Sequence, residues 1–279
     1  MQPAIEHVSD TALMVAACRA LETDLDCGLI RDPLARRVAG ERGIAILANT
    51  SSKAWMQFGI GVRTRFMDEL VMLAIADGVD TVVNLGAGLD TRPWRLDLPA
   101  DLLWVEVDFP DMLAYKDAAL EGVAPHCRLE RMSADLNQPA ERAAALNRAR
   151  GRSLLMTEGL LMYLPGETVD ALAKEGLGRF SYWLMDINSR ELMKMAHGDF
   201  LETLNRVSAE SRLDGPEILD LVQKTGWSVA EKRTYFAETT NISPDRVALL
   251  MQALGITPDP NAPRPADVGS GVWLFRSDS

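Results

Sequence analysis

The stretch DTVVNLGAGLDTRPWRLDLPADLLWVEVDFP, residues 80–110, decides the fold. An apolar run over Thr81–Leu85 ends at the turn Gly86-Ala87-Gly88, and a second apolar run, Leu102–Val107, ends on Asp108. A strand, a glycine turn, a helix start and a second strand with an acid at its tip form the unit with which a doubly wound sheet holds a nucleoside. The glycines let the backbone approach the ligand, and the acid accepts hydrogen bonds from the ribose hydroxyls.

The residues after the turn narrow the choice of ligand. Dinucleotide-binding folds place a third small residue three positions after the second glycine, so that a helix sits close under a pyrophosphate. Here that position is Thr91, followed by the bulky Arg92-Pro93-Trp94. The sequence therefore favours an adenosine ligand without phosphates. Taken alone, the glycines also fit an ordinary tight turn, and Asp108 is what favours the nucleoside.

Four motifs in order carry a resemblance to a known family: NLGAGLDTRPWRL (84–96), EVDFP (106–110), SADL (133–136) and TEGLLMYLP (157–165). They resemble the leucine carboxyl methyltransferase family over roughly residues 8–190, whereas the C-terminal third matches in outline only. The resemblance implies S-adenosyl-L-methionine as cofactor and a bacterial, polyketide-type branch. It also implies an α/β fold, a seven-stranded doubly wound Rossmann-like methyltransferase sheet with an N-terminal helical cap and helical inserts.

Composition bounds the class of protein. The chain has 279 residues, 47% of them hydrophobic, which suffices for one large α/β domain. Its apolar runs have strand length and its N-terminus lacks a signal-peptide pattern, so we expect no membrane partner. Cys18, Cys27 and Cys127 are scattered, which fits a reducing, cytoplasmic location. A formal net charge of −11 argues against nucleic acid as a partner. We expect a monomer or weak dimer.

The histidines argue against two further classes of site. His7, His126 and His197 lie far apart and have no ligand-like spacing. The sequence therefore predicts no metal site and no Ser-His-Asp triad.

Two regions are expected, a helical cap over residues 1–77 and a methyltransferase core over 78–279. In the cap, Ser9 or Asp10 is expected to cap a first helix, and Asp32-Pro33 to begin a second. A longer helix is predicted over Ala54–Ala76, with Val62, Phe66, Leu70 and Leu73 on one face and Gly78 ending it.

From Thr81 the pattern alternates between strands and helices, which predicts a mainly parallel sheet. The expected strands are Thr81–Leu85, Leu102–Val107, His126–Met132, Ser153–Thr157, Ser181–Ile187, Ser228–Arg233 and Gly271–Arg276, and the expected helices lie near Pro110–Glu121, Pro139–Ala149, Glu167–Leu177 and Gly215–Thr225. By resemblance, the last strand pairs antiparallel between the fifth and sixth. Segments 188–214 and 236–268 are inserts that we expect to act as lids over the substrate.

The candidate cofactor residues follow the motifs. Backbone groups of Gly86, Ala87 and Gly88 should face the amino-acid end of the cofactor, and Asp108, with the neighbouring Phe109, its ribose. The alternative for Asp108 is a helix N-cap. The resemblance assigns Asp135 and Leu136 to the adenine, whereas the residues alone also fit a capped turn ahead of Pro139.

Two further residues are expected at the reacting end. Glu158 ends the fourth strand, where a carboxylate can accept from the cofactor ammonium or offset its sulfonium charge; burial of an acid requires such a role or an ion pair. Tyr163 lies where the family approaches substrate, or else fills the core beside Leu160 and Leu164. Both are the catalytic candidates.

Basic residues complete the candidate site. Arg63 matches the register of the family arginine that grips the cofactor carboxylate, and a guanidinium suits a bidentate contact. Arg65 is the alternative. The phosphatase-methylating branch of the family carries a lysine near the N-terminus, where this chain offers Arg19. This departure argues against a protein as the methyl acceptor.

The sequence thus predicts an S-adenosyl-L-methionine-dependent O-methyltransferase that acts on a carboxylate or hydroxyl of a small molecule. A carboxylate acceptor needs no general base, whereas a phenol does or must ionise. The alternatives are methylation of a protein C-terminal carboxylate and a catalytically inactive nucleoside-binding module. A nicotinamide-dependent reductase is disfavoured by Thr91 and by the lack of a Tyr-x-x-x-Lys pair.

Overall fold

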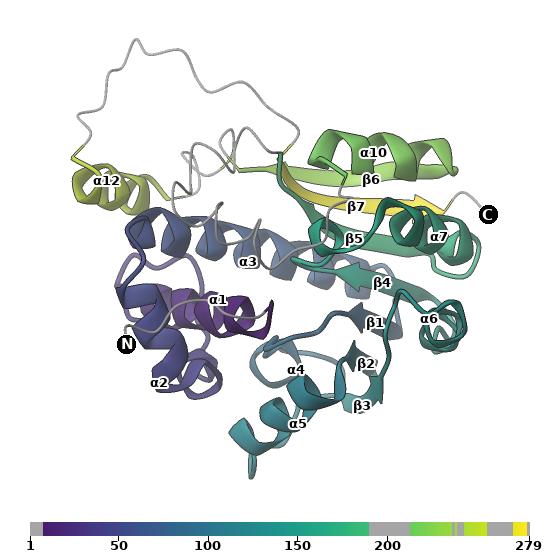
Figure 1. Cartoon of the computed structure of the whole chain (residues 1–279), viewed down its shortest axis with the longest axis horizontal. Helices are drawn as coiled ribbons and strands as arrows, with labels where there is room; N and C mark the ends of the chain where they lie inside the picture. Colours follow the sequence, from purple (N-terminus) through teal and green to yellow (C-terminus); the bar gives the residue numbers. More distant parts are fainter. Residues whose placement is uncertain (1–7, 190–212, 236–237, 239–242, 256–269, 278–279) are drawn as a thin grey trace.

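A seven-stranded sheet of order β3-β2-β1-β4-β5-β7-β6 organises the molecule (Figure 1). The computed structural model describes residues 8–189, 213–235, 238, 243–255 and 270–277. The strands are β1 (Thr81–Leu85), β2 (Leu103–Asp108), β3 (Arg128–Ser133), β4 (Ser153–Thr157), β5 (Tyr182–Ile187), β6 (Trp227–Thr234) and β7 (Gly271–Ser277). All seven expected strands are present, with ends shifted by at most two residues.

Six of the strands keep the direction expected of a doubly wound fold, and β7 is reversed. β1 pairs in parallel with β2 and β4, while β7 pairs antiparallel with both β5 and β6. This confirms the predicted place of the last strand. Because the order reverses between β1 and β4, the ends of these strands form the switch point at which such sheets bind ligands.

Helices cover both faces of the sheet. One core joins Val83, Leu85 and Val105 to α6 (Pro139–Leu146), α7 (Gly166–Gly176) and α10 (Gly215–Lys224). The other joins Val82 and Trp104 to the long α3 (Lys53–Ala76). Neighbouring strand residues point to opposite faces, so a strand buried on both sides is apolar throughout, as β1 and β4 are. The remaining helices near β2 are the short α4 (Arg92–Arg95) and α5 (Pro110–Ala119).

The N-terminal helices differ from the prediction at their starts. α1 spans Val8–Thr23, so Ser9 and Asp10 lie inside its first turn instead of before it, and Asp10 pairs with Arg42 at 2.7 Å. α2 spans Ala35–Ala48 and begins after Asp32-Pro33. Asp32 nevertheless contributes to the turn, because its Oδ1 accepts from the backbone N of Leu34 at 3.2 Å.

The apolar face of α3 is narrower than predicted. Val62, Phe66 and Leu70 are at most 2% exposed, but Leu73 is 43% exposed. Leu73 therefore lies at the edge of the stripe. Gly78 ends the helix region with φ +91°, a conformation that glycine adopts without strain.

The C-terminal part contains one described helix of the second insert, α12 (Pro244–Ala253), which packs on α3. Figure 1 shows α1, α2 and α12 gathered around one end of α3. The first insert lies, apart from its ends, outside the described residues, as does most of the second. No helix in the described ranges combines the length and the apolarity that crossing a bilayer requires.

Candidate functional site

A cavity of about 660 Å³ opens at the switch point of the sheet. Its walls come from the ends of β1, β2 and β4, from the residues after β3, and from α1, α3 and the short 3-10 turn η1 (Leu161–Tyr163). This volume lies within the range of small-molecule sites, roughly 300–1,000 Å³. All the residues proposed from the sequence for cofactor binding and catalysis line this cavity: Arg63, Gly86, Ala87, Gly88, Asp108, Phe109, Asp135, Leu136, Glu158 and Tyr163.

The glycine turn is built for close approach. Gly86 and Gly88 have φ values of +62° and +45°, in the left-handed region. A Cβ at Gly86 would lie 2.8 Å from Cδ1 of Leu160, so a larger residue would have to displace that side chain and adopt a strained φ. At Gly88 the backbone N donates to Oδ2 of Asp108 at 2.6 Å. The turn is therefore fixed to the tip of β2.

Asp108 ties the turn to the start of α5. Its Oδ1 accepts from the backbone N of Phe109 at 2.7 Å, so the N-cap-like contact and the place in the cavity coexist. Burial raises the pKa of Asp108, although the N–H groups of Gly88 and Phe109 oppose the shift. Phe109 itself is 58% exposed and offers its ring at the rim of the cavity.

Asp135 shapes the turn after β3. Its Oδ1 accepts from the backbone N of Asn137 at 3.0 Å, and its own N donates to Glu141 at 2.7 Å. The capped turn considered from the sequence is thus present, and Asp135 also lines the cavity next to the buried Leu136. The acid holds its loop with one oxygen, so a ligand contact through the other remains compatible with this structure.

Glu158 lies just beyond β4, between the guanidiniums of Arg63 and Arg92. Nη1 of Arg92 donates to its Oε2 at 2.6 Å, and Nε of Arg63 lies 3.0 Å from its Oε1. Burial alone would raise the pKa of Glu158, but the two guanidiniums outweigh it and lower the pKa to about 2. Glu158 is therefore a stable carboxylate and a poor proton acceptor near neutral pH.

Arg63 joins two strand ends and, unlike Arg65, lines the cavity. Besides Glu158, its Nη1 contacts Oδ2 of Asp186, at the end of β5, at 3.3 Å. Arg65, the alternative, pairs with Glu69 at 2.9 Å on an exposed face of α3 and does not line the described cavity. Burial raises the pKa of Asp186, which the charge of Arg63 opposes and that of Glu158 reinforces.

Arg92 and two of its partners, Asp68 and Asp90, were not proposed as site residues from the sequence. The side chain is 2% exposed and lies against three carboxylates, Asp68 at 2.7 Å, Glu158 at 2.6 Å and Asp90 at 3.1 Å. Arg95 shares Asp68 with it at 2.6 Å. The two arginines stand three residues apart in the short helix α4, directly after the glycine turn, but nothing in their spacing distinguishes a buried from an exposed pair.

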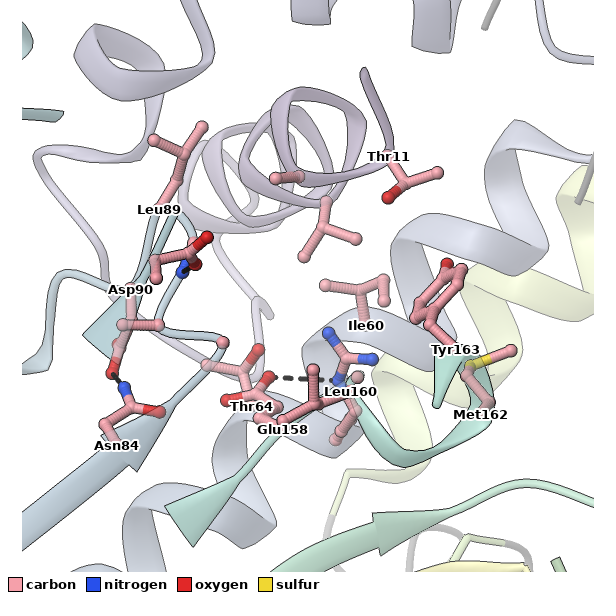
Figure 2. Close-up of a pocket in the computed structure, with 18 of the residues that line it drawn as sticks. Thr11, Ile60, Thr64, Asn84, Leu89, Asp90, Glu158, Leu160, Met162 and Tyr163 are labelled. Carbon is pink, nitrogen blue, oxygen red and sulfur yellow. Dashed lines mark hydrogen bonds and ion pairs between the residues drawn. The ribbon is translucent and has the colours of Figure 1, made fainter. Parts of the chain in front are cut away.

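Asn84 and Arg19 hold the loop that joins β1 to α4. Asn84, inside β1, donates to Oδ2 of Asp90 at 3.0 Å (Figure 2). Arg19 pairs with Asp32 at 2.9 Å and donates to the carbonyl of Leu89 at 2.6 Å. The residue proposed in place of the family lysine therefore holds the backbone beside the turn.

Figure 2 shows that the cavity has two ends with Glu158 between them. Asn84, Leu89 and Asp90 lie on one side, and Met162 and Tyr163 lie on the other. Tyr163 is half-buried at the end of η1, so it lines the cavity and is not an interior core residue. Among the residues that the structure describes, no three His, Cys, Asp or Glu side chains are placed to hold a metal ion.

The sequence of this chain is similar to those of proteins named as methyltransferases. The model of the family described as leucine carboxyl methyltransferase matches residues 12–175, more than half of the chain. A Frankia alni protein named, by inference, an S-adenosyl-L-methionine-dependent methyltransferase is 37% identical over 175 residues, 58% of this chain and 61% of that protein. A Streptomyces coelicolor protein of the same name is 37% identical over 174 residues, 58% of this chain and 62% of its own.

The matched region thus spans less than two thirds of the length of either relative. Among solved structures, a DUF574 family protein from Streptomyces avermitilis superposes with a TM-score of 0.61 at 15% identity, over 96% of this chain and 97% of that chain. This likeness concerns the fold. The family match contains the lining residues of the cavity from Ala12 to Leu164 and leaves Thr11, Asn188 and Tyr235 outside it. The chain belongs to the leucine carboxyl methyltransferase family.

Proposed function

We propose that this protein is an S-adenosyl-L-methionine-dependent O-methyltransferase whose acceptor is a carboxylate or hydroxyl of a small molecule. The observation that carries the proposal is the clamp between Gly88 and Asp108, 2.6 Å long, at the mouth of a cavity of about 660 Å³. Family membership and the names of the relatives support the methyltransferase class.

The residues of the cavity fit such a cofactor. Both oxygens of Asp108 are already oriented by backbone N–H groups, which leaves lone pairs for two ribose hydroxyls. Arg92 Nη2 and Thr64 Oγ1 are buried without a hydrogen-bond partner among the described residues. Because an unsatisfied buried donor is unfavourable, a ligand carboxylate that reaches either group would be stabilised.

Charge also suits a cationic ligand. Five carboxylates, Asp32, Asp68, Asp90, Glu158 and Asp186, surround the four guanidiniums of Arg19, Arg63, Arg92 and Arg95. If all five carboxylates are ionised, Asp186 included, this cluster carries one more negative charge than positive charges. When bound, S-adenosyl-L-methionine supplies a methyl group on a positively charged sulfur, and Figure 2 shows the Glu158 carboxylate between the two ends of the cavity.

The chain's own residues would then bind the cofactor, position the acceptor and exclude water. The Asp108 clamp and the glycine turn hold the nucleoside end, and Arg63 or Arg92 holds the carboxylate end. Tyr163 and its neighbours in η1 hold the acceptor oxygen at attack distance, which is the main contribution a methyl-transfer site makes. The apolar walls of α1 and α3 exclude water from the reacting centre.

Methyl transfer from labelled S-adenosyl-L-methionine, measured against a panel of carboxylic acids, phenols and C-terminal-leucine peptides, tests this function. We expect transfer to at least one small molecule and none to the peptides. Tyr163→Phe should slow turnover with little change in cofactor affinity, whereas Tyr182→Phe, a tyrosine at the outer end of β5, should leave both unchanged. Transfer to peptides alone would replace the small-molecule acceptor by a protein. Cofactor binding without any transfer would favour the inactive module.

A further inference from the structure

The two ends of the cavity differ in chemistry, and this difference bears on the acceptor; the inference rests on the function proposed above. The end near the glycine turn carries Asn84, Asp90 and Asp108, which suit a polar nucleoside. At the other end lie Ile60, Met162 and Tyr163, from α3 and η1, and Trp55 and Phe58, on the turns of α3 that precede Ile60, line the same cavity. If the cofactor occupies the first end, the acceptor meets the second.

The second end is apolar, aromatic and adaptable. Three of these five side chains are aromatic rings, which contribute large contact areas and prefer to pack against other rings. Met162 has a flexible thioether, which fits ring systems of irregular shape and contacts their edges. Figure 2 shows Ile60, Met162 and Tyr163 grouped around this end. The wall therefore matches a flat, apolar molecule.

The charges beside this end disfavour an anion. Four basic residues line the described part of the cavity, and each is ion-paired: Arg19 with Asp32, Arg63 with Glu158 and Asp186, Arg92 with three carboxylates, and Arg95 with Asp68. Arg92 has one unpartnered nitrogen, but its surroundings remain negative. Within the part of the chain that the structure describes, an acceptor carboxylate would have to displace one of these ion pairs or lie beside Glu158 without a cation, which like-charge repulsion disfavours.

We propose that the acceptor is an uncharged hydroxyl on an aromatic ring system, that is, a phenol. Its oxygen forms a bond to the methyl carbon while the carbon–sulfur bond breaks, and the sulfur keeps the electron pair of that bond. The phenol binds uncharged and ionises in this step: its proton passes to solvent water as the new bond forms, so no general base is required of the protein. Glu158, with a pKa of about 2, stays ionised throughout and does not accept that proton.

A matched pair of probes tests the acceptor class. 1-Naphthol and 1-naphthoate share one ring system, but at pH 7 the first is neutral and the second is ionised. Calorimetry with the full chain saturated with S-adenosylhomocysteine should give a Kd for 1-naphthol at least tenfold lower than for 1-naphthoate. Equal or tighter binding of 1-naphthoate, or no binding of 1-naphthol, overturns the proposal. Failure to bind S-adenosylhomocysteine would instead overturn the proposed function, so the two failures are distinguishable.

A charge placed at the apolar end tests where the acceptor lies. Ile60→Lys adds an ammonium there, whereas Ile60→Met keeps the wall apolar and serves as the control. Relative to Ile60→Met, we expect Ile60→Lys to bind 1-naphthoate about tenfold more tightly and to lose part of its affinity for 1-naphthol, with unchanged affinity for S-adenosylhomocysteine. An unchanged preference between the two probes would contradict the placement of the acceptor at this end.

Discussion

Asp108 shows how one side chain serves structure and ligand binding together. Its two oxygens accept from the backbone of Gly88 and of Phe109, which fixes both the glycine turn and the first turn of α5. The sequence presented these as alternatives, a ribose contact or a helix cap. The structure shows that the cap-like bonds leave room for the ribose contact, because a carboxylate has about four acceptor sites.

Replacing Asp108 should therefore weaken cofactor binding. We expect Asp108→Ala to reduce the binding free energy of S-adenosylhomocysteine by roughly 1–3 kcal/mol, since the ribose hydroxyls would lose their partner. Calorimetry on the variant measures this change. Asp101→Ala, which removes an exposed acid just before β2, serves as the control and should bind normally. An Asp108→Ala protein that is folded and binds at full strength would remove Asp108 from the site.

The choice between Arg63 and Arg92 as the partner of the cofactor carboxylate is a second test. An ammonium cannot reproduce the planar fork of a guanidinium, so a lysine at the right position should impair binding of S-adenosylhomocysteine. We expect Arg63→Lys to weaken it by about tenfold, with Arg65→Ala as a silent control. If Arg63→Lys is silent and Arg92→Lys is not, the unpartnered nitrogen of Arg92 holds the carboxylate instead.

The residues missed from the sequence share one physical trait. Asp68, Asp90, Arg92 and Asp186 follow no motif of spacing, and each acquires its role from a partner 2 to 123 positions away in the chain. A charged residue in a loop or short helix is usually solvated, so burial of such a network cannot be inferred from residue types. Glu158 was predictable because a strand end at the switch point places its side chain in the cavity.

At the scale of elements, α12 is joined to the cap by a buried ion pair. Nε and Nη2 of Arg246 donate to the two carboxylate oxygens of Glu22 in α1, both at 2.8 Å, and the side chains are 3% and 0% exposed. The guanidinium also lies 5.1 Å from the ring centroid of Phe58, which lines the cavity. The pair therefore connects the second insert to the wall of the proposed acceptor end.

Breaking this pair should destabilise the fold. We expect Arg246→Met to lower the free energy of unfolding by about 3–5 kcal/mol, because Glu22 would remain buried without its cation. The double variant Glu22→Gln/Arg246→Met should recover part of that loss in urea titrations. Lys224→Met, which removes the exposed partner of Asp220, is the control and should have little effect. A harmless Arg246→Met would show that α12 is not held by this pair.

The strands and helices could be predicted from hydrophobic periodicity and turn residues, whereas the residues at which the N-terminal helices begin could not. A strand buried on both faces is recognisable as a short apolar run bounded by glycine or charged residues, as Thr81–Leu85 is. The start of α1 was misplaced because Asp10 was expected to cap a helix end, but it pairs with Arg42 from α2 instead. Such tertiary pairings compete with local capping and are not visible in one sequence.

At the scale of the whole molecule, acidic residues exceed basic ones and the net charge is −11. The net charge does not reveal that Arg19, Arg63, Arg92 and Arg95 form buried ion pairs with carboxylates around the cavity. The proposed division at residue 77 and the lid role of the inserts remain predictions. For the first insert the direct test is replacement of 190–212 by a short linker, which should preserve binding of S-adenosylhomocysteine while turnover is lost.

The stability of the fold should depend on pH through Glu158. Its pKa is lowered from 4.5 to about 2 in the folded state, so its contribution is present above pH 4.5 and is lost as the pH falls toward 2. We therefore expect the difference in unfolding free energy between the native protein and Glu158→Gln to shrink from pH 5 to pH 3 in urea titrations. A difference that stays constant with pH would show that the two arginines do not stabilise the ionised form. Asp108, with a raised pKa, acts in the opposite direction and is common to both proteins, whereas the raised pKa of Asp186 depends in part on the charge of Glu158 and should be lower in the variant.

The identity of the nucleoside ligand is the central claim, because the roles proposed for Asp108, Arg63, Glu158 and the apolar end all depend on it. Calorimetric titration of the full chain with S-adenosyl-L-methionine, S-adenosylhomocysteine and NAD measures it directly. The account predicts saturable one-to-one binding of both adenosyl ligands and no comparable binding of NAD, since Thr91 and Arg92 leave no seat for a pyrophosphate. Tighter binding of NAD, or no binding of either adenosyl ligand, would contradict it.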